Sequence, residues 1–558
     1  MSKISFFSLG GMDENEKPCY VLDVDGQYYI FNLGITIPVY TKLGIKKIIP
    51  YVDWITNNIK SIKGIFIGNA SHRNIGAIQY VYDIIKGIPI YTSKLGSIIL
   101  NSHFNKKSMQ KYNNFESINT RILEPLKTYE IGNVKITPFR VVCSLAGSYG
   151  FVITTNDGNI VYLDEFIING DKNSAFASDI TKINRITGGK ILLLINNVGN
   201  VAKHNGFTSP NHKTKSFYNN ILMKKNDSRV IVACHYHDIY TFLTLAMLAK
   251  EKQIPFVIYN PLFMNVFNTL INDKYFDNSK LLSLPIHKIN EMSKGIVVMS
   301  STPDRIFNKL ISLTKNEDDI LKLKKSDYVI LGFKTISGFE RFEADVMDRY
   351  SKLDIDVTNL PRTILKMEAS SEDHKFLIGE LSPKYVIPTL GMYYEMIKYG
   401  NCLAEAGFNI KNCINLYNGE VFTLINGEEQ SQKRNRLDVH DMFVGNQGLL
   451  TEGANILQER QMMSESGIIF YSLEYNNKDR CFNDKNIDFQ DFGVVAKSYE
   501  TDKLFKNISK EAFDFASKTL KEMNKFNSKE LKQLVKRFIS KQVEKNLEKE
   551  PIVIVTII

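Results

Sequence analysis

The chain has 558 residues, 44% of them hydrophobic and 23% charged, which excludes a disordered protein and at this length predicts roughly two to four domains. Lysine and arginine (70) outnumber aspartate and glutamate (60), but the net charge of +10 favours polyanionic partners only weakly because it is spread over a large surface. The six cysteines include no C-x-x-C pair, and we find neither a signal peptide nor an apolar run of about 20 residues. A cytoplasmic protein without disulfides or membrane spans is expected.

Predicted strands dominate the first part of the chain. They are the apolar or alternating runs at residues 4–9, 20–24, 27–32, 64–67, 134–139, 151–154, 159–163 and 190–195. The run at 64–67 leads into the polar loop 68–74, and apolar periodicity predicts a helix over 75–85. Loop side chains converge at the carboxyl ends of strands in α/β proteins, so this loop is laid out as an active site. It holds few residues that could catalyse a reaction.

The middle of the chain alternates between strands and helices. Strands are expected at 229–233, 255–259, 296–299 and 328–331, and helices at 239–248 and 341–350. This βαβ rhythm predicts a parallel sheet in a domain of its own.

The last third of the chain continues with a strand at 384–388 and a helix at 393–406, and the polar segment 427–436 is expected to be a loop or linker. Ser528 is the expected N-cap of an amphipathic helix, which is followed by a strand at 552–558. The whole chain is therefore expected to be an α/β protein in three parts: a first domain, an insert within it, and a small α+β domain at the end.

The order and spacing of several stretches resemble the ribonuclease J family, and the chain is identified as a degenerate member of it. These stretches are the opening Leu9-Gly10-Gly11, the strand 64–67, the run Lys384-Tyr385-Val386-Ile387-Pro388 and the junction 439–448. The resemblance implies a metallo-β-lactamase αββα sandwich, an inserted β-CASP domain with a parallel sheet, and a small α+β C-terminal domain. The implied boundaries are 1–207 and 363–455 for the two parts of the sandwich (the second including a linker), 208–362 for the insert and 456–558 for the C-terminal domain.

The family's reaction uses two metal ions, usually zinc, held by a His-x-His-x-Asp-His loop and further histidines and aspartates. Carried over position by position, these ligands fall on Asn32, Asn69, Ser71, Arg73, Asn74, Cys143, Glu165 and Leu390. Only Glu165 and Cys143 could ligate a metal, and Arg73 adds a permanent positive charge. We therefore expect no catalytic residue, no metal and no cofactor. We also expect Arg73 to pair with Glu165 or Asp164 in place of the metals.

The β-CASP motifs are altered as well. The motif acid falls on Asn196 or Asn197, the Ser-Asn-x-His-Arg stretch on 237–241, and the final Gly-His on Met367-Glu368. Candidate contacts to RNA phosphates are Ser300, Ser301, Thr302, His237 and Glu368.

Several of these residues have simpler interpretations. The segment 300–302 is equally consistent with a turn that caps the following helix. His235 and His237 could share an ion, or could be two loop histidines. Cys143 is better explained as a small buried residue than as a nucleophile, because no histidine and acid partner stands beside it. His72 is expected to face solvent or to form hydrogen bonds.

The resemblance implies a role in RNA processing and mRNA decay. Without metal ligands, the expected protein is a pseudoenzyme that binds RNA and forms a homo- or hetero-oligomer, a dimer or tetramer, with an active ribonuclease J paralogue. One alternative is a residual metal-dependent 5′–3′ exo- or endoribonuclease. Another is a protein scaffold of an RNA degradation complex.

Overall fold

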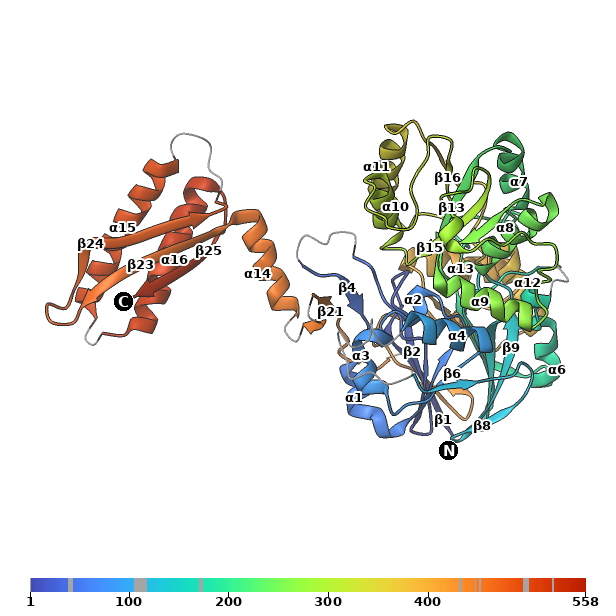
Figure 1. Ribbon diagram of the computed structural model, residues 1–558. Helices are drawn as coiled ribbons and strands as arrows, with labels where there is room; N and C mark the ends of the chain where they lie inside the picture. Colours follow the sequence, from blue (N-terminus) through green and yellow to red (C-terminus); the bar gives the residue numbers. More distant parts are fainter. Residues whose placement is uncertain are drawn as a thin grey trace. The chain divides into compact units, whose positions relative to one another are not determined.

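The computed structural model describes residues 2–38, 44–104, 118–169, 174–430, 434–446, 448–450, 453–494, 501–523 and 526–558. The chain forms two compact units, one comprising Met1–Val39 with Ile45–Leu449 and the other Tyr40–Gly44 with Leu450–Ile558 (Figure 1). In the described part of the chain, no helix combines the length and the apolar character that crossing a membrane requires.

The first unit contains an eight-stranded sheet in the order β20-β19-β1-β2-β3-β5-β6-β7. Its strands are β1 (Lys3–Gly10), β2 (Cys19–Val24), β3 (Gln27–Phe31), β5 (Ile62–Ile67), β6 (Ile90–Thr92), β7 (Thr120–Ile122), β19 (Phe422–Ile425) and β20 (Glu428–Glu429). A six-stranded sheet has the order β18-β12-β11-β10-β9-β8. It consists of β8 (Tyr129–Ile131), β9 (Val134–Val141), β10 (Ser148–Thr155), β11 (Gly158–Leu163), β12 (Ile191–Asn197) and β18 (Tyr385–Thr389).

Alternating residues of the first sheet enter two different cores. Phe7 and Ile30 pack in the cluster that includes helix residues such as Val81, whereas Phe6 and Phe31 pack with residues of the second sheet. The period of two in the sequence therefore places each strand between a helical layer and a second sheet. The helices of this body are α1 (Asp53–Asn58), α2 (His72–Ile75), α3 (Ile78–Ile85), α4 (Lys94–His103), α6 (Ile183–Thr187), α12 (Ser371–Leu381) and α13 (Tyr393–Glu405).

The insert contains a five-stranded, wholly parallel sheet in the order β14-β15-β13-β16-β17, which confirms the predicted parallel pairing. The strands are β13 (Arg229–His235), β14 (Phe256–Ile258), β15 (Gly295–Ser301), β16 (Tyr328–Leu331) and β17 (Asp356–Asn359). The helices are α7 (Lys215–Lys224), α8 (Ile239–Lys252), α9 (Pro261–Asn272), α10 (Ile306–Thr314) and α11 (Glu340–Ser351). Residues of α8 and α9 pack in the cluster of the first sheet's helices, whereas α10 and α11 line the opposite core.

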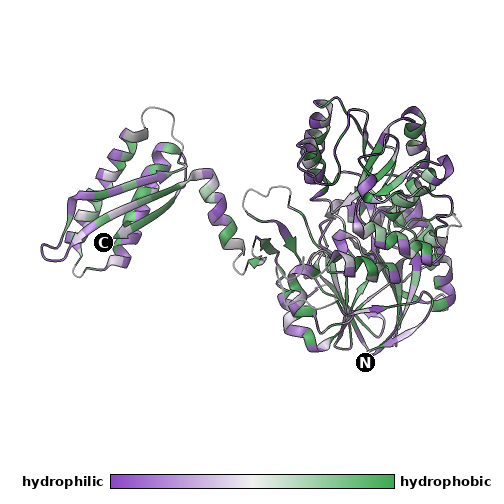
Figure 2. Cartoon of the chain, viewed as in Figure 1, coloured by the Kyte–Doolittle hydropathy of each residue, from purple (hydrophilic) through white to green (hydrophobic). Residues whose placement is uncertain are grey.

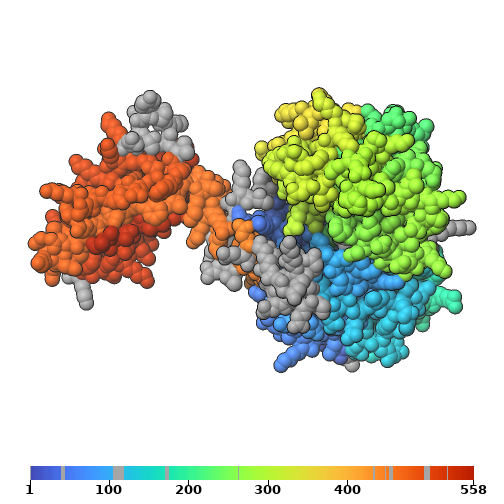
Figure 3. Space-filling model, viewed as in Figure 1, coloured from blue at the N-terminus to red at the C-terminus, as the bar shows by residue number. Residues whose placement is uncertain are grey.

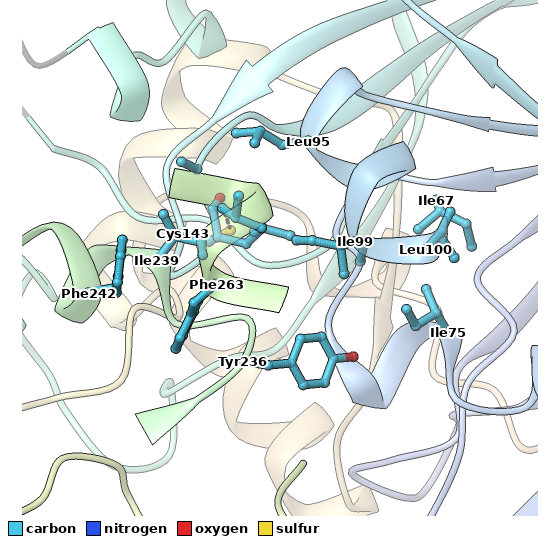
Figure 4. Packing of buried hydrophobic residues seen from close by; sticks show 14 of the residues in the cluster. Ile67, Ile75, Leu95, Ile99, Leu100, Cys143, Tyr236, Ile239, Phe242 and Phe263 are labelled. Atoms are coloured by element: carbon cyan, nitrogen blue, oxygen red, sulfur yellow. Dashed lines mark hydrogen bonds between the residues drawn. The ribbon is translucent and has the colours of Figure 1, made fainter. Parts of the chain in front are cut away.

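The insert and the body share a continuous core. Ile67, Ile75 and Ile99 of the body lie in the same buried cluster as Phe242 and Phe263 of the insert (Figure 4). In the space-filling view, the green and yellow surface of the insert abuts the blue and cyan surface of the body (Figure 3). The boundaries expected at residues 207, 362 and 455 stay predictions.

The remaining short elements connect these sheets. Strand β4 (Lys47–Ile49) pairs with β21 (Met442–Gly445), and β22 (Gly448–Leu450) follows. The 3-10 turns are η1 (Ile59–Ser61), η2 (Ser174–Phe176), η3 (Ile180–Lys182), η4 (Ile286–Lys288) and η5 (Ile410–Asn412). The segment expected to be a linker at 427–436 includes β20, and its residues 431–433 lie outside the described residues.

The second unit is a three-stranded sheet in the order β24-β23-β25 with helices. Its elements are α14 (Gly453–Ser466), β23 (Ile468–Asn476), β24 (Cys481–Phe492), α15 (Thr501–Glu522), α16 (Ser528–Leu547) and β25 (Ile552–Ile557). The apolar residues Leu531, Val535, Ile539 and Val543 of α16 are buried in one cluster with residues of α15, β23 and β25, as their spacing predicts. Figure 2 shows hydrophobic and hydrophilic residues alternating along the helices of this unit. The expected N-cap is wrong by one residue, because the side chain of Asn527, not of Ser528, accepts a hydrogen bond from the backbone N–H of Glu530.

Candidate functional site

The loop at the carboxyl end of β5 is held against the second sheet by a close backbone approach. The backbone N–H of Tyr149 donates to the carbonyl of Gly68 (2.9 Å), and a Cβ at Gly68 would lie 2.2 Å from the Tyr149 carbonyl oxygen. Only glycine fits there, and it brings the following residue, Asn69, to the ends of the strands of both sheets. The predicted single helix over 75–85 is divided into α2 and α3 at Gly76 and Ala77.

Three side-chain amides surround one buried carboxylate at the centre of the site. Asp164 accepts hydrogen bonds from Asn32 (3.0 Å), Asn74 (2.7 Å) and Asn197 (3.3 Å), which come from three separate segments. Burial raises the pKa of Asp164, and the charge of Arg73 and the three amides oppose this shift. Sequence reasoning named Asp164 only as an alternative partner of Arg73, and not as the acceptor of three side-chain amides. Its position next to Glu165, at the end of a buried strand, was the available signal.

The second carboxylate, Glu165, is held by an amide and a guanidinium. Asn69 donates to Glu165 Oε2 at 2.7 Å, and Arg73 donates to Glu165 Oε1. Arg73 also lies 3.4 Å from Glu368, and its own side chain is 23% exposed. The expected ion pair between Arg73 and Glu165 is therefore present.

Burial and neighbouring charges shift the pKa values of Glu165 and Arg73. Burial raises the pKa of Glu165 to about 7, although the charge of Arg73 lowers it. For Arg73, the attraction of Glu165 and Glu368 outweighs the effect of burial and raises its pKa, so the guanidinium is always charged.

The other positions at which the resemblance expects altered ligands hold side chains poorly suited to binding a metal. Cys143 is fully buried and its thiol contacts Ser148 Oγ at 3.2 Å, and burial raises the pKa of the thiol, so it stays neutral. Ser71 is buried, and its hydroxyl has no hydrogen-bond partner among the described residues. Leu390 is buried with φ of 51°, a left-handed conformation that is strained for a leucine.

The donor set does not fit a dinuclear metal centre. Three carboxylates, those of Asp164, Glu165 and Glu368, and one neutral thiol lie near the position, and the cationic Arg73 lies among them. Within the described ranges, no group of three or more histidine, cysteine, aspartate or glutamate side chains is arranged to hold a metal ion.

The candidate phosphate contacts lie at the carboxyl ends of two neighbouring strands. Ser300 and Ser301 end β15 and stand in register with Cys234 and His235 of β13. The rings of His235 and His237 are 5.5 Å apart, and burial lowers the pKa of both, that of His237 to about 3.

Three other polar features surround these strand ends. The Oγ of Ser300 and the Nδ1 of His237 are buried and have no hydrogen-bond partner among the described residues. Lys47 contacts Asp304 at 2.6 Å just beyond β15. The carboxylate of Glu368 faces Arg73 and offers a phosphate no donor.

The prediction for His72 is wrong. Its side chain is buried, and neither ring nitrogen has a hydrogen-bond partner among the described residues. The ring lies 5.8 Å from that of His103 and 6.4 Å from that of Tyr236. An aromatic environment built by α4 and the end of β13 replaces the solvent that the sequence suggested.

Sequence reasoning also missed a buried histidine beside the site. The Nδ1 of His374 lies 3.1 Å from the amide of Asn196, and its Nε2 lies 3.0 Å from the carbonyl of Val198. The only local signal was its place on the apolar side of α12. Burial lowers its pKa to about 4, so the ring is neutral.

Comparisons with known proteins find relatives along the whole length of the chain. Residues 455–558 match the ribonuclease J C-terminal domain. The chain is 38% identical to the uncharacterised protein MG423 of Mycoplasma genitalium, over 100% of both chains. It is 23% identical to ribonuclease J 2 of Staphylococcus saprophyticus, over 99% of this chain and 97% of that one. A crystal structure of a protein of unknown function from Enterococcus faecalis V583 shares the fold over 76% of this chain and 100% of its own, with a TM-score of 0.53 and 13% identity. The C-terminal domain and the full-length relatedness together establish that the chain belongs to the ribonuclease J family.

Proposed function

We propose that this protein is a non-catalytic ribonuclease J subunit that binds RNA and associates with an active paralogue in RNA processing and decay. The observation that carries the proposal is the position of Arg73. Its guanidinium contacts Glu165 and Glu368 at a position where the family holds a metal. A fixed monocation supplies the counter-charge of the carboxylates but cannot activate water as a divalent metal does.

The exchange of the ligands is physically consistent. A buried carboxylate without a counter-charge costs several kcal/mol, roughly 3–5 when one partner of a buried pair is removed. Asp164 is instead surrounded by three amides, and Glu165 by an amide and Arg73. Histidines would have no role there without a metal, and the site contains none of the family's ligand histidines.

The architecture supports the family's domain scheme. The two facing sheets with helices fit a metallo-β-lactamase sandwich made of residues 1–207 and 363–455, and the parallel five-stranded sheet fits a β-CASP insert at 208–362. The unit that ends the chain fits the C-terminal domain at 456–558.

The retained RNA contact is proposed at the carboxyl ends of β13 and β15. The unpartnered Ser300 Oγ and His237 Nδ1, with Ser301 and Thr302 beside them, are polar groups of the kind that hydrogen-bond to phosphate oxygens. The buried, unpartnered atoms cost free energy unless a ligand or water satisfies them.

Metal analysis and a cleavage assay on the purified full-length protein test this proposal together. We expect far less than one zinc or manganese ion per chain, and binding without cleavage of a 5′-monophosphorylated single-stranded RNA in Mn²⁺. About two metal ions per chain would overturn the proposal. Cleavage that disappears in Glu165→Gln would support the residual ribonuclease instead.

The partner is tested by affinity purification after nuclease treatment. An active ribonuclease J that co-purifies supports the proposed pairing, and Ser300→Ala should weaken RNA binding without releasing that partner. Retention of other degradation proteins, with no RNA binding by the purified chain, would favour the scaffold.

A further inference from the structure

The insert contains a cavity that the former metal site does not include. A volume of about 400 Å³ opens beyond the carboxyl ends of β16 and β17, under the first turns of α11. Open parallel sheets bind their ligands at this edge, and ligand pockets have volumes of about 300–1,000 Å³. The cavity is therefore in the expected place and of sufficient size for a small organic ligand.

Two of the residues that line the cavity are cationic. They are Lys334 and Arg362. The ammonium of Lys334 donates to the carbonyl of Pro361, which holds it at the wall and leaves two N–H donors. The guanidinium of Arg362 is exposed and has no carboxylate partner among the described residues. These two groups suit an anion such as a phosphate.

The lining also contains two carboxylates, Glu340 and Glu343, and hydrogen bonds hold Glu343 in place. Glu343 accepts hydrogen bonds from Thr335 Oγ1 and, at 2.5 Å, from the amide of Asn359. A carboxylate has about four acceptor positions, so Glu343 can still accept N–H donors from the cavity. Met347 and Leu360 provide apolar parts of the lining.

A ligand that satisfies both the two cations and Glu343 must carry an anion and N–H donors on a flat, partly apolar body. The negative charge of Glu343 would repel a phosphate alone, and the positive charges of Lys334 and Arg362 would repel a simple cation. A nucleotide has all three properties. Guanine fits best because its N1–H and its amino group are neighbouring donors that one carboxylate can accept together.

We propose that this cavity binds one nucleotide, with the phosphate on Lys334 and Arg362 and the base edge on Glu343. Phe333, which lines the cavity, stacks on His235 at 4.7 Å, so the cavity adjoins the proposed phosphate contacts. A base turned out of an RNA strand is one source of the ligand, and that arm of the proposal rests on the proposed function. A free nucleotide has the same chemistry.

Binding measurements on the full-length protein separate these sources. The free-nucleotide probes are GMP and UMP, measured by calorimetry. The RNA probes are an all-uridine dodecamer and the same strand with one central guanosine, measured by fluorescence anisotropy. We expect the guanosine strand to bind about fivefold or more tightly than the all-uridine strand, as one base-edge contact provides.

The variants identify the cavity as the cause. Glu343→Gln should remove the guanosine preference, and Arg362→Ala should weaken binding of the guanosine strand about fivefold or more. The control is Lys325→Ala in the same insert, where an ammonium with 82% exposure pairs with Asp354 at 3.1 Å outside the cavity. It should leave the preference unchanged, and thermal unfolding should show that all variants fold.

The outcomes are distinct. A preference for the guanosine strand without GMP binding assigns the site to RNA. GMP binding that is tighter than UMP binding and is weakened by Arg362→Ala assigns the site to free nucleotides as well. No guanosine preference in either form, or a preference that Glu343→Gln retains, would overturn the proposal. Binding of the all-uridine strand measures the proposed RNA-binding function by itself, so each can fail alone.

Discussion

The guanidinium of Arg73 donates to the carboxylate of Glu165, two residues that lie 92 positions apart in the chain. Arg73 also contacts Glu368, so one cation neutralises two carboxylates of limited exposure. This arrangement shows how buried carboxylates are compensated here by a side-chain cation.

Replacing Arg73 by methionine should destabilise the protein. Removal of one partner of a buried pair costs about 3–5 kcal/mol, and because the Arg73 side chain is 23% exposed we expect roughly 2 kcal/mol from urea unfolding. The double variant with Glu165→Gln should recover part of this loss, since one of the two uncompensated carboxylates is then neutral while that of Glu368 remains. A single variant as stable as the wild type would contradict the role assigned to Arg73.

The neutral His374 should make stability fall in acid. Its pKa is about 4 in the folded protein against an ordinary value of 6.5, so the unfolded chain binds the proton first as the pH falls. The contribution of His374 to the free energy of unfolding should therefore be fully present above pH 6.5. It should decrease as the pH falls towards 4, with a total loss of about 3 kcal/mol. Urea unfolding across this range should show a shallower decrease for His374→Leu. An identical slope in both proteins would exclude this cause.

The buried ion pair of the insert should be sensitive to the loss of one partner. Arg229 and Asp327 are fully buried, and they contact each other at 2.9 and 2.7 Å. Asp327→Ala should cost about 3–5 kcal/mol in the free energy of unfolding because it leaves a buried guanidinium unpaired. The matched control is Asp348→Ala, which removes an exposed partner of Lys352 and should change the stability by less than about 0.5 kcal/mol. Equal effects would contradict the difference in burial.

The N-cap of α16 should be located by two alanine substitutions. Asn527→Ala removes the acceptor of the Glu530 N–H and should cost about 1 kcal/mol of stability, whereas Ser528→Ala should cost no more than a few tenths. Thermal unfolding followed by the helical circular-dichroism signal compares the two. A larger effect at Ser528 would restore the cap expected from the sequence.

Much of the fold could be predicted because its signals are local. The alternation in β10 and β11, with the Asp157-Gly158 turn between them, gives the observed hairpin within a few residues. The helix expected over 75–85 is instead interrupted at Gly76 and Ala77. Ile35 packs so closely against Gly76 that a Cβ there would lie 2.3 Å from the Ile35 side chain. Periodicity shows which face is apolar, but it does not show where another segment approaches.

The sequence by itself determined the α/β class, the parallel sheet of the insert and the place of the loop 68–74, since these depend on residue types at short spacing. The tertiary structure alone decided the contacts. It brought Asn32, Asn74 and Asn197 to Asp164, and Arg73 to Glu368 across 295 residues. It buried His72 and opened the cavity beside Glu343. Side-chain partners over such separations depend on how strands and helices pack, which a local pattern does not encode.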